Sequence, residues 1–184
     1  MKRSELAHIL RAASRIAGET DIVVFGSQSI LGSFDEDDLP DAAVGSVEAD
    51  VTFWTDARDE KADMVDGAIG EGSEFHQMNG YYAQGVSITT AKLPADWKDR
   101  VVVFQNFSSV PGRGICLEPH DLVVSKLVAG REKDRVFAAA LLDAGLIQAS
   151  TLMERARMLD ELPGVIRRIV KWIEWWESRF QSRP

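Results

Sequence analysis

The chain has 184 residues, of which 45% are hydrophobic and 27% are charged, as is ordinary for a soluble globular protein. Its single cysteine, Cys116, excludes an internal disulfide framework and a cysteine-based zinc cluster. The net charge of −8 is uneven, because residues 1–100 carry 9 basic and 19 acidic side chains whereas residues 101–184 carry 12 and 10. This balance disfavours non-specific nucleic-acid binding over the whole surface and leaves room for a local basic site in the second half.

The start of the chain, MKRSELAHILRAASRIAG, has the pattern of an amphipathic helix and lacks the apolar core of a signal peptide. No apolar run approaches the roughly 20 residues needed to span a bilayer. We therefore expect a cytoplasmic protein with no membrane partner.

The first half alternates short apolar runs with helical patterns. The run DIVVF, ended by Gly26, is typical of a central strand buried on both faces. The next stretch, SQSILGS, resembles the start of a helix, and EADVTFWT alternates as a second strand does. The expected strands are 21–25, 48–55, 81–88 and 100–107, and the expected helices are 4–17 and 56–69.

An acidic insert, DEDDLPDAA (residues 35–43), separates the first two strands. Its composition is that of a mobile surface loop. We predict that the insert is poorly ordered without a ligand and stays outside the core.

From Glu118 onward the pattern is helical, in four segments with short breaks: 118–130, 131–146, 149–162 and 163–180. The expected fold is therefore α/β (α+β), with a small mixed sheet, flanking helices and a helical half after it. We place the α/β core at residues 1–117 and the C-terminal helical region, packed on the same core, at 118–184.

Two short motifs in the first half suit nucleotide chemistry. A Gly26-Ser27 turn after a strand offers backbone N–H groups and a hydroxyl to phosphate. Glu48 and Asp50 stand two apart on a strand, so they project from one face and repel each other unless a cation such as Mg²⁺ or Mn²⁺ lies between them. Taken singly, either motif is also found as an ordinary turn or a solvated strand face.

Taken together, the Gly-Ser turn and the carboxylate pair resemble the signature of the nucleotidyltransferase superfamily, and specifically its AbiEii-like branch, which includes toxins of toxin–antitoxin systems. A later segment, KLVAGREKD, is similar to a helical motif of that branch and contains Lys126, Arg131 and Asp134. The segments GSQSILG, EADV, IGEGSEFH, LPADWKDR and SKLVAGREKD also resemble a little-characterised bacterial family close to it, over roughly residues 20–146.

The resemblance implies a metal-dependent transfer of a nucleoside monophosphate from a nucleoside triphosphate to RNA, for instance tRNA, or to a protein. It implies that Glu48 and Asp50 hold the metal and that Gly26, Ser27, Lys126 and Arg131 bind the nucleotide. Asp134 would then be a third acid or would position the acceptor hydroxyl. An antitoxin is the partner that this branch implies.

Three departures from the superfamily pattern are present, and the last of them keeps a second interpretation open. The first carboxylate of the pair is Glu48, where the superfamily usually has Asp. The interval between Ser27 and Glu48 is longer than usual, because it contains the acidic insert. The strand expected at residues 81–88 carries Gln84, and no acid, where a third carboxylate is usual. The alternative is a catalytically degenerate module with the same fold that binds a nucleotide or a protein. The oligomeric state is not predicted.

Overall fold

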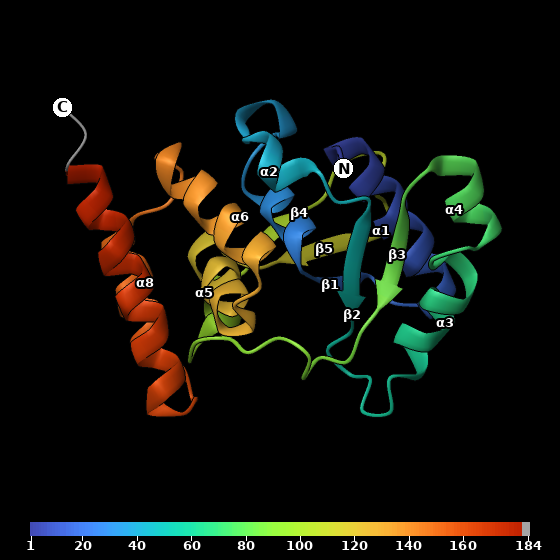
Figure 1. Cartoon of the computed structure of the whole chain (residues 1–184). Helices are drawn as coiled ribbons and strands as arrows, with labels where there is room; N and C mark the ends of the chain where they lie inside the picture. Colours follow the sequence, from blue (N-terminus) through green and yellow to red (C-terminus); the bar gives the residue numbers. More distant parts are fainter. Residues whose placement is uncertain (182–184) are drawn as a thin grey trace.

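A five-stranded mixed sheet lies at the centre of the computed structural model, which describes residues 1–181 (Figure 1). Its strands are β1 (Asp21–Phe25), β2 (Glu48–Thr52), β3 (Tyr82–Gly85), β4 (Val102–Phe104) and β5 (Arg113–Cys116), in the order β3-β2-β1-β5-β4. β1 runs antiparallel to β2 and parallel to β5, while β3 is parallel to β2 and β4 is antiparallel to β5. The predicted α/β class with a small mixed sheet is confirmed.

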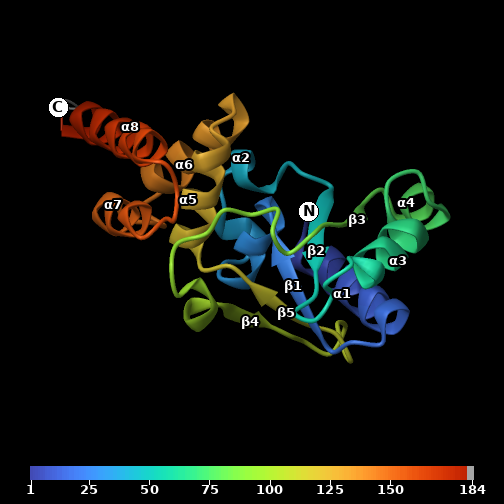
Figure 2. The ribbon, with the colours of Figure 1, turned by 90° about the horizontal axis from the view of Figure 1, so that it is seen from below.

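Helices pack around this sheet and form both ends of the molecule. Figure 2 shows α3 and α4 at one end of the molecule and α7 and α8 at the other. The helices are α1 (Arg3–Ala17), α2 (Asp41–Val44), α3 (Glu60–Ile69), α4 (Glu74–Asn79), α5 (Pro119–Ala129), α6 (Glu132–Asp143), α7 (Ala149–Arg157) and α8 (Pro163–Gln181). Three short 3₁₀ helices complete the set: η1 (Ser27–Gly32), η2 (Glu36–Asp38) and η3 (Trp97–Arg100). Among the described residues, no helix has both the length and the apolarity to cross a membrane.

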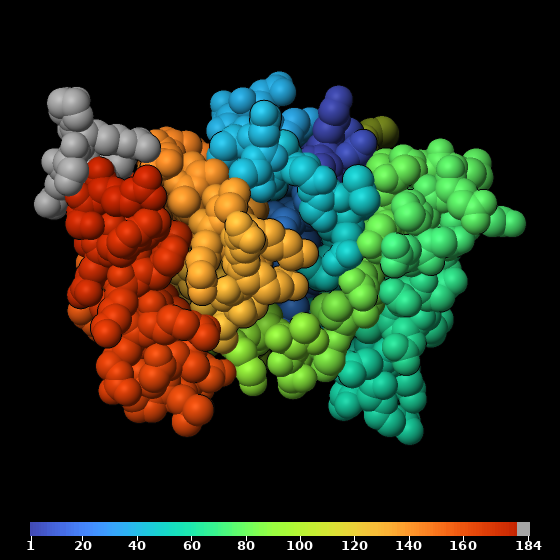
Figure 3. Space-filling model, viewed as in Figure 1, coloured from blue at the N-terminus to red at the C-terminus, as the bar shows by residue number. Residues whose placement is uncertain are grey.

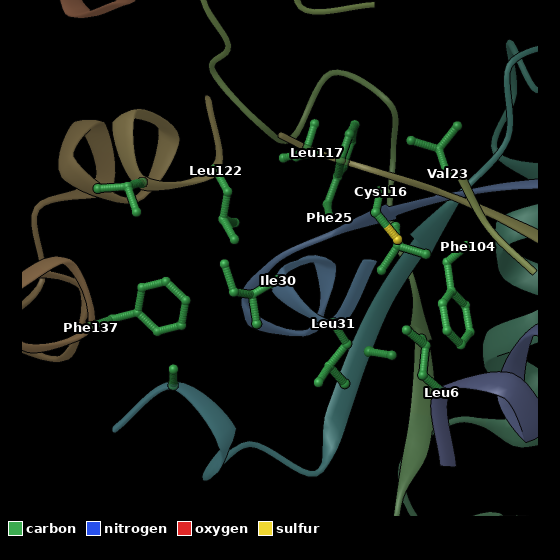
Figure 4. Packing of buried hydrophobic residues seen from close by; sticks show 14 of the residues in the cluster. Leu6, Val23, Phe25, Ile30, Leu31, Phe104, Cys116, Leu117, Leu122 and Phe137 are labelled. Atoms are coloured by element: carbon green, nitrogen blue, oxygen red, sulfur yellow. The ribbon is translucent and has the colours of Figure 1, made fainter. Parts of the chain in front are cut away.

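One cluster of buried hydrophobic side chains joins the sheet to the C-terminal helices. In Figure 4, Ile30 of η1 lies between the sheet and two side chains of the helical region, Leu122 of α5 and Phe137 of α6. Ile30 is 0% exposed, and burying such a side chain contributes roughly 1.5–3 kcal/mol. The helical region therefore packs directly against the residues that follow β1.

The acidic insert differs from the prediction in one respect, because it contributes to the core. Leu39 and Ala43 are 8% and 1% exposed and belong to the main hydrophobic cluster, whereas Asp37, Asp38 and Asp41 face solvent. The insert folds into η2 and α2, and the two apolar side chains attach it to the protein. Its acidic composition predicted a loop outside the core, and that prediction was wrong.

Two further elements, β5 and α4, were not expected from the sequence. β5 is a four-residue strand that pairs with both β1 and β4, and α4 is a six-residue helix whose side chains are not buried. Gly114 in β5 lies so close to α1 that a β-carbon there would come within 2.9 Å of Leu10 Cδ1. Strand β5 thus completes the sheet beneath α1.

Candidate active site

An open cleft of about 840 Å³ lies where the end of β1 and the strand β2 face α5 and α6. Figure 3 shows it as a hollow between α6, the residues leading into β2 and the segment after β3, with the end of β1 at its floor. All seven residues singled out from the sequence line this cleft: Gly26, Ser27, Glu48, Asp50, Lys126, Arg131 and Asp134. The structure therefore brings together residues that are up to about a hundred positions apart in the chain.

Gly26 has a backbone conformation that only glycine adopts readily. Its φ of 62° and ψ of −164° lie in a region that is strained for every residue with a side chain. In addition, a β-carbon at this position would overlap Oδ2 of Asp50. The turn at the end of β1 is thus packed directly against the carboxylate pair, and glycine is required there for two independent reasons.

Glu48 and Asp50 form the acidic wall of the cleft. Asp50 pairs in register with Phe25 at the end of β1, which places its carboxyl group beside the Gly26 turn. Burial, together with the charge of Glu48 and a hydrogen bond to it, raises the pKa of Asp50 to about 6. Such a pair is unfavourable in the absence of a cation, and it fits a hard divalent ion that prefers carboxylate oxygens.

The number of acids at the site limits how a metal could be held. Within residues 1–181, no group of three or more His, Cys, Asp or Glu side chains is arranged to hold a metal ion. Glu48 and Asp50 would therefore be the two protein ligands, with water and substrate oxygens completing the coordination. Gln84 lines the same cleft and pairs in register with Asp50, at the position expected for a third acid.

Lys126 forms the opposite, basic wall. Its Nζ donates a hydrogen bond of 2.9 Å to the Ser27 hydroxyl and lies 4.5 Å from the centre of the Phe137 ring. Burial lowers the pKa of Lys126, while the nearby carboxylates of Asp134 and Asp50 act in the opposite direction. The ammonium group is therefore held at a fixed point across the cleft from the carboxylate pair.

Asp134 holds the basic wall in place. Its carboxylate is 0% exposed, accepts a hydrogen bond of 2.7 Å from Arg131 Nε and lies 3.7 Å from Lys126 Nζ. Burial alone would raise the pKa of Asp134, but the hydrogen bonds from Arg131 and the charge of Lys126 outweigh it and lower the pKa. Two cations therefore engage Asp134 in this structure, and its role as a third acid or in positioning the acceptor hydroxyl stays a prediction.

The turn at Gly130 explains why sequence spacing could not relate Lys126 to Asp134. Gly130 ends α5 with a φ of 68°, and α6 begins two residues later in a new direction. Arg131 precedes α6, and its backbone N–H donates a hydrogen bond to the Asp134 carboxylate. Two helices, rather than one helix face, form this wall.

Two residues of the site were missed by sequence reasoning. Lys92, in the segment after β3, lines the cleft and adds a basic group to its rim. Tyr82, at the start of β3, donates a hydrogen bond of 2.7 Å from its hydroxyl to Glu48 Oε2. Neither belongs to a motif, and only the register of β3 on β2 shows that Tyr82 stands beside Glu48.

Comparison with known proteins agrees with this geometry at the level of the superfamily. A search of curated proteins and a search of solved structures each found no match. A family model described as "Nucleotidyltransferase of unknown function (DUF6036)" matches residues 4–155, which include every residue of the cleft discussed above. The chain therefore belongs to this family of nucleotidyltransferases.

Proposed function

We propose that the protein transfers a nucleoside monophosphate from a nucleoside triphosphate to an acceptor, with Mg²⁺ or Mn²⁺ held by Glu48 and Asp50. The observation that carries the proposal is the placement of the Gly26-Ser27 turn. It touches the Asp50 carboxylate on one side and, through the Ser27 hydroxyl, the Lys126 ammonium on the other. A triphosphate with its cation needs both kinds of group within one cleft.

The basic wall supplies the charge that a triphosphate requires. Lys126, Arg131 and Lys133 of this wall line the cleft, and Lys92 adds a charge at the rim. Ammonium and guanidinium groups form charge-assisted hydrogen bonds with phosphate oxygens. Because Asp134 fixes Arg131 and Lys126 before any substrate arrives, these donors are oriented in advance.

In the proposed reaction an acceptor hydroxyl oxygen forms a bond to the α-phosphorus. The bond from that phosphorus to the oxygen bridging to the β-phosphate breaks, and pyrophosphate leaves with the electron pair. The hydroxyl proton passes to solvent in the open cleft. When bound, the divalent ion would neutralise phosphate charge and stabilise the negative charge that develops on the phosphate oxygens. The chain itself positions both reactants, with Lys126 next to the departing phosphates.

The experiment that tests this proposal uses each of the four nucleoside triphosphates labelled on the α-phosphate, with Mg²⁺ and either total RNA or total protein as acceptor. We expect label transfer to one acceptor class with one preferred base, and no transfer from γ-labelled triphosphate. Asp50→Asn should abolish it. Transfer that persists in Asp50→Asn, or transfer of the γ-label, would contradict the assigned chemistry.

Gln84 favours a second candidate, a degenerate module that binds a nucleotide without turning it over. An amide stands in register beside Asp50 where a third carboxylate is usual. The same assay separates the two candidates when it is combined with a binding measurement. Triphosphate binding without transfer to any acceptor supports the module, whereas transfer supports the enzyme.

The resemblance to the AbiEii-like branch adds finer proposals about the biological role. Within it, the protein would act as the toxin of a toxin–antitoxin system, and its partner would be an antitoxin that covers or competes for the cleft. These roles stay predictions. Growth arrest on expression of the wild type, but not of Asp50→Asn, is the result expected for a toxin.

Removal of the Lys126 charge should weaken triphosphate binding while the fold is kept. In Lys126→Met the side chain still packs on Phe137 but loses its ammonium group. Losing a hydrogen bond with a charged group typically costs about 1.5–3 kcal/mol, or roughly ten- to hundredfold in affinity. Calorimetric titration with a non-hydrolysable triphosphate and Mg²⁺ measures this change.

The matched control for that titration is Arg135→Ala. Arg135 also carries a positive charge on α6, but it is exposed and does not line the cleft. Its affinity should stay within about twofold of the wild type, as expected for a solvated charge. Equal affinities of Lys126→Met and the wild type, in folded proteins, would remove Lys126 from the phosphate site.

A further inference from the structure

Tyr82 contacts Glu48, a residue of the proposed metal site, from outside the cleft. It is 8% exposed and does not line the cleft, yet its hydroxyl donates a hydrogen bond of 2.7 Å to Glu48 Oε2. The two residues are direct partners in the parallel pairing of β2 and β3, so their side chains project from the same face of the sheet. Tyr82 therefore restricts the orientation of the Glu48 carboxylate without approaching a substrate.

The Tyr82 ring is itself held in place. The ring of His76, from α4, packs against it with 4.6 Å between ring centres. The His76 ring is fixed in turn, because its Nδ1 accepts a hydrogen bond of 3.0 Å from the Gly72 backbone N–H. α4, which the sequence did not predict, thus supports a side chain that orients a carboxylate of the cleft.

We propose that Tyr82 is a positioning residue that sets both the affinity and the selectivity of the metal site formed by Glu48 and Asp50. This inference rests on the proposed function, since it concerns the metal of that same site. With Oε2 engaged by the Tyr82 hydroxyl, Glu48 presents its other oxygen, Oε1, to a cation. Hydrogen bonds of this kind to a ligating group typically change metal affinity 10- to 100-fold.

The expected selectivity follows from the ligand chemistry of the two common hard cations. Ca²⁺ accepts six to eight oxygens and often takes both oxygens of one carboxylate, whereas Mg²⁺ and Mn²⁺ suit six ligands and single carboxylate oxygens. A Glu48 that is limited to one oxygen therefore favours the smaller ions. Loss of the Tyr82 hydroxyl frees the second oxygen and should shift the preference toward Ca²⁺.

The test is a Mn²⁺ titration of the nucleotide-free protein, followed by the electron paramagnetic resonance signal of free Mn²⁺. The variant is Tyr82→Phe, which removes only the hydroxyl. The matched control is Tyr81→Phe at the neighbouring position, whose hydroxyl bonds His8 Nδ1 at 2.8 Å and has no contact with the cleft. We expect Tyr82→Phe to bind Mn²⁺ 10- to 100-fold more weakly and Tyr81→Phe to stay within about twofold of the wild type.

Competition with Ca²⁺ tests whether Tyr82 acts by orienting the Glu48 carboxylate or only by supporting the fold. Ca²⁺ should displace Mn²⁺ more readily from Tyr82→Phe than from the wild type or from Tyr81→Phe. Equal weakening for both ions would show that Tyr82 only supports the fold, and unchanged affinity in Tyr82→Phe would also overturn the proposal. The wild type alone provides a further check, because a wild-type site that binds Ca²⁺ as tightly as Mg²⁺ would contradict the proposed preference for the smaller ions.

Asp50→Asn separates a failure of this inference from a failure of the proposed function. If the wild type binds Mn²⁺ and Asp50→Asn does not, the metal site stands, and only the Tyr82 result decides the role of Tyr82. If the wild type does not bind Mn²⁺, both the metal site and the role of Tyr82 are overturned.

Discussion

Asp50→Asn is expected to abolish nucleotidyl transfer and, at the same time, to make the metal-free protein more stable at neutral pH. The pKa of Asp50 is raised from 3.8 to about 6, chiefly by burial and then by Glu48. A carboxyl group with a higher pKa in the folded state binds its proton more tightly there. Its contribution to stability is therefore present below about pH 4 and is lost as the pH rises through about 6.

The size of this effect follows from the same pKa. One pKa unit corresponds to about 1.4 kcal/mol, and water in the open cleft reduces the penalty to roughly 1–3 kcal/mol above pH 6. Asparagine carries no charge and avoids that penalty. Thermal denaturation in the presence of a chelator should thus show a higher Tm for Asp50→Asn at neutral pH and little difference at acidic pH.

Addition of Mg²⁺ or Mn²⁺ should reverse the order of stability. A cation that binds only the folded wild type contributes about 4.1 kcal/mol at a thousand times its Kd, which exceeds that penalty, and the variant should lose this gain. Asp41→Asn, which removes the same charge from an exposed position of α2, is the control and should behave as the wild type. A metal-induced shift that survives in Asp50→Asn would show that the metal binds elsewhere.

Gly26→Ala is expected to destabilise the protein and to eliminate triphosphate binding. The φ and ψ of Gly26 are strained for alanine by about 1–3 kcal/mol, and the methyl group would overlap the Asp50 carboxylate. Displacing that carboxylate adds roughly another 1–3 kcal/mol, as overpacking in a core does. Denaturant unfolding and calorimetric titration measure the two losses.

Gly18→Ala is the matched control for the strained glycine. Gly18 ends α1 with a φ of 68°, but a β-carbon there meets no atom within 4 Å. It should therefore show only the cost of the left-handed conformation, on the order of 1 kcal/mol, with normal nucleotide binding. Equal losses in the two variants would mean that the contact with Asp50 is unimportant.

Sequence patterns predicted the elements whose signal is local. β1 is a continuous apolar run, β2 alternates, and the C-terminal helices repeat apolar residues at helical spacing, so each was expected near its observed position. β5 has only four residues, one of them Gly114, and so lacks a pattern that separates it from a loop. Its existence depends on pairing with β1 and β4, which is a long-range property.

The candidate site shows the same division between local and long-range information. The motifs identified Gly26, Asp50 and Lys126 because each stands in a short recognisable segment. The contacts of Asp134 could not be predicted, since the turn at Gly130 decides which side chains it meets. Tyr82 could not be predicted either, because one register step of β3 on β2 would remove it from Glu48.

The two walls of the cleft are separated by a large part of the chain, and this has a consequence for synthesis of the protein. Glu48 and Asp50 leave the ribosome long before Lys126, Arg131 and Asp134 do. A nascent chain that has emerged as far as β5 carries the repelling carboxylates without the cations opposite them, and Ile30 has not yet been covered by α5 and α6. The two walls of the cleft thus come together only after α5 and α6 have emerged and folded onto the sheet.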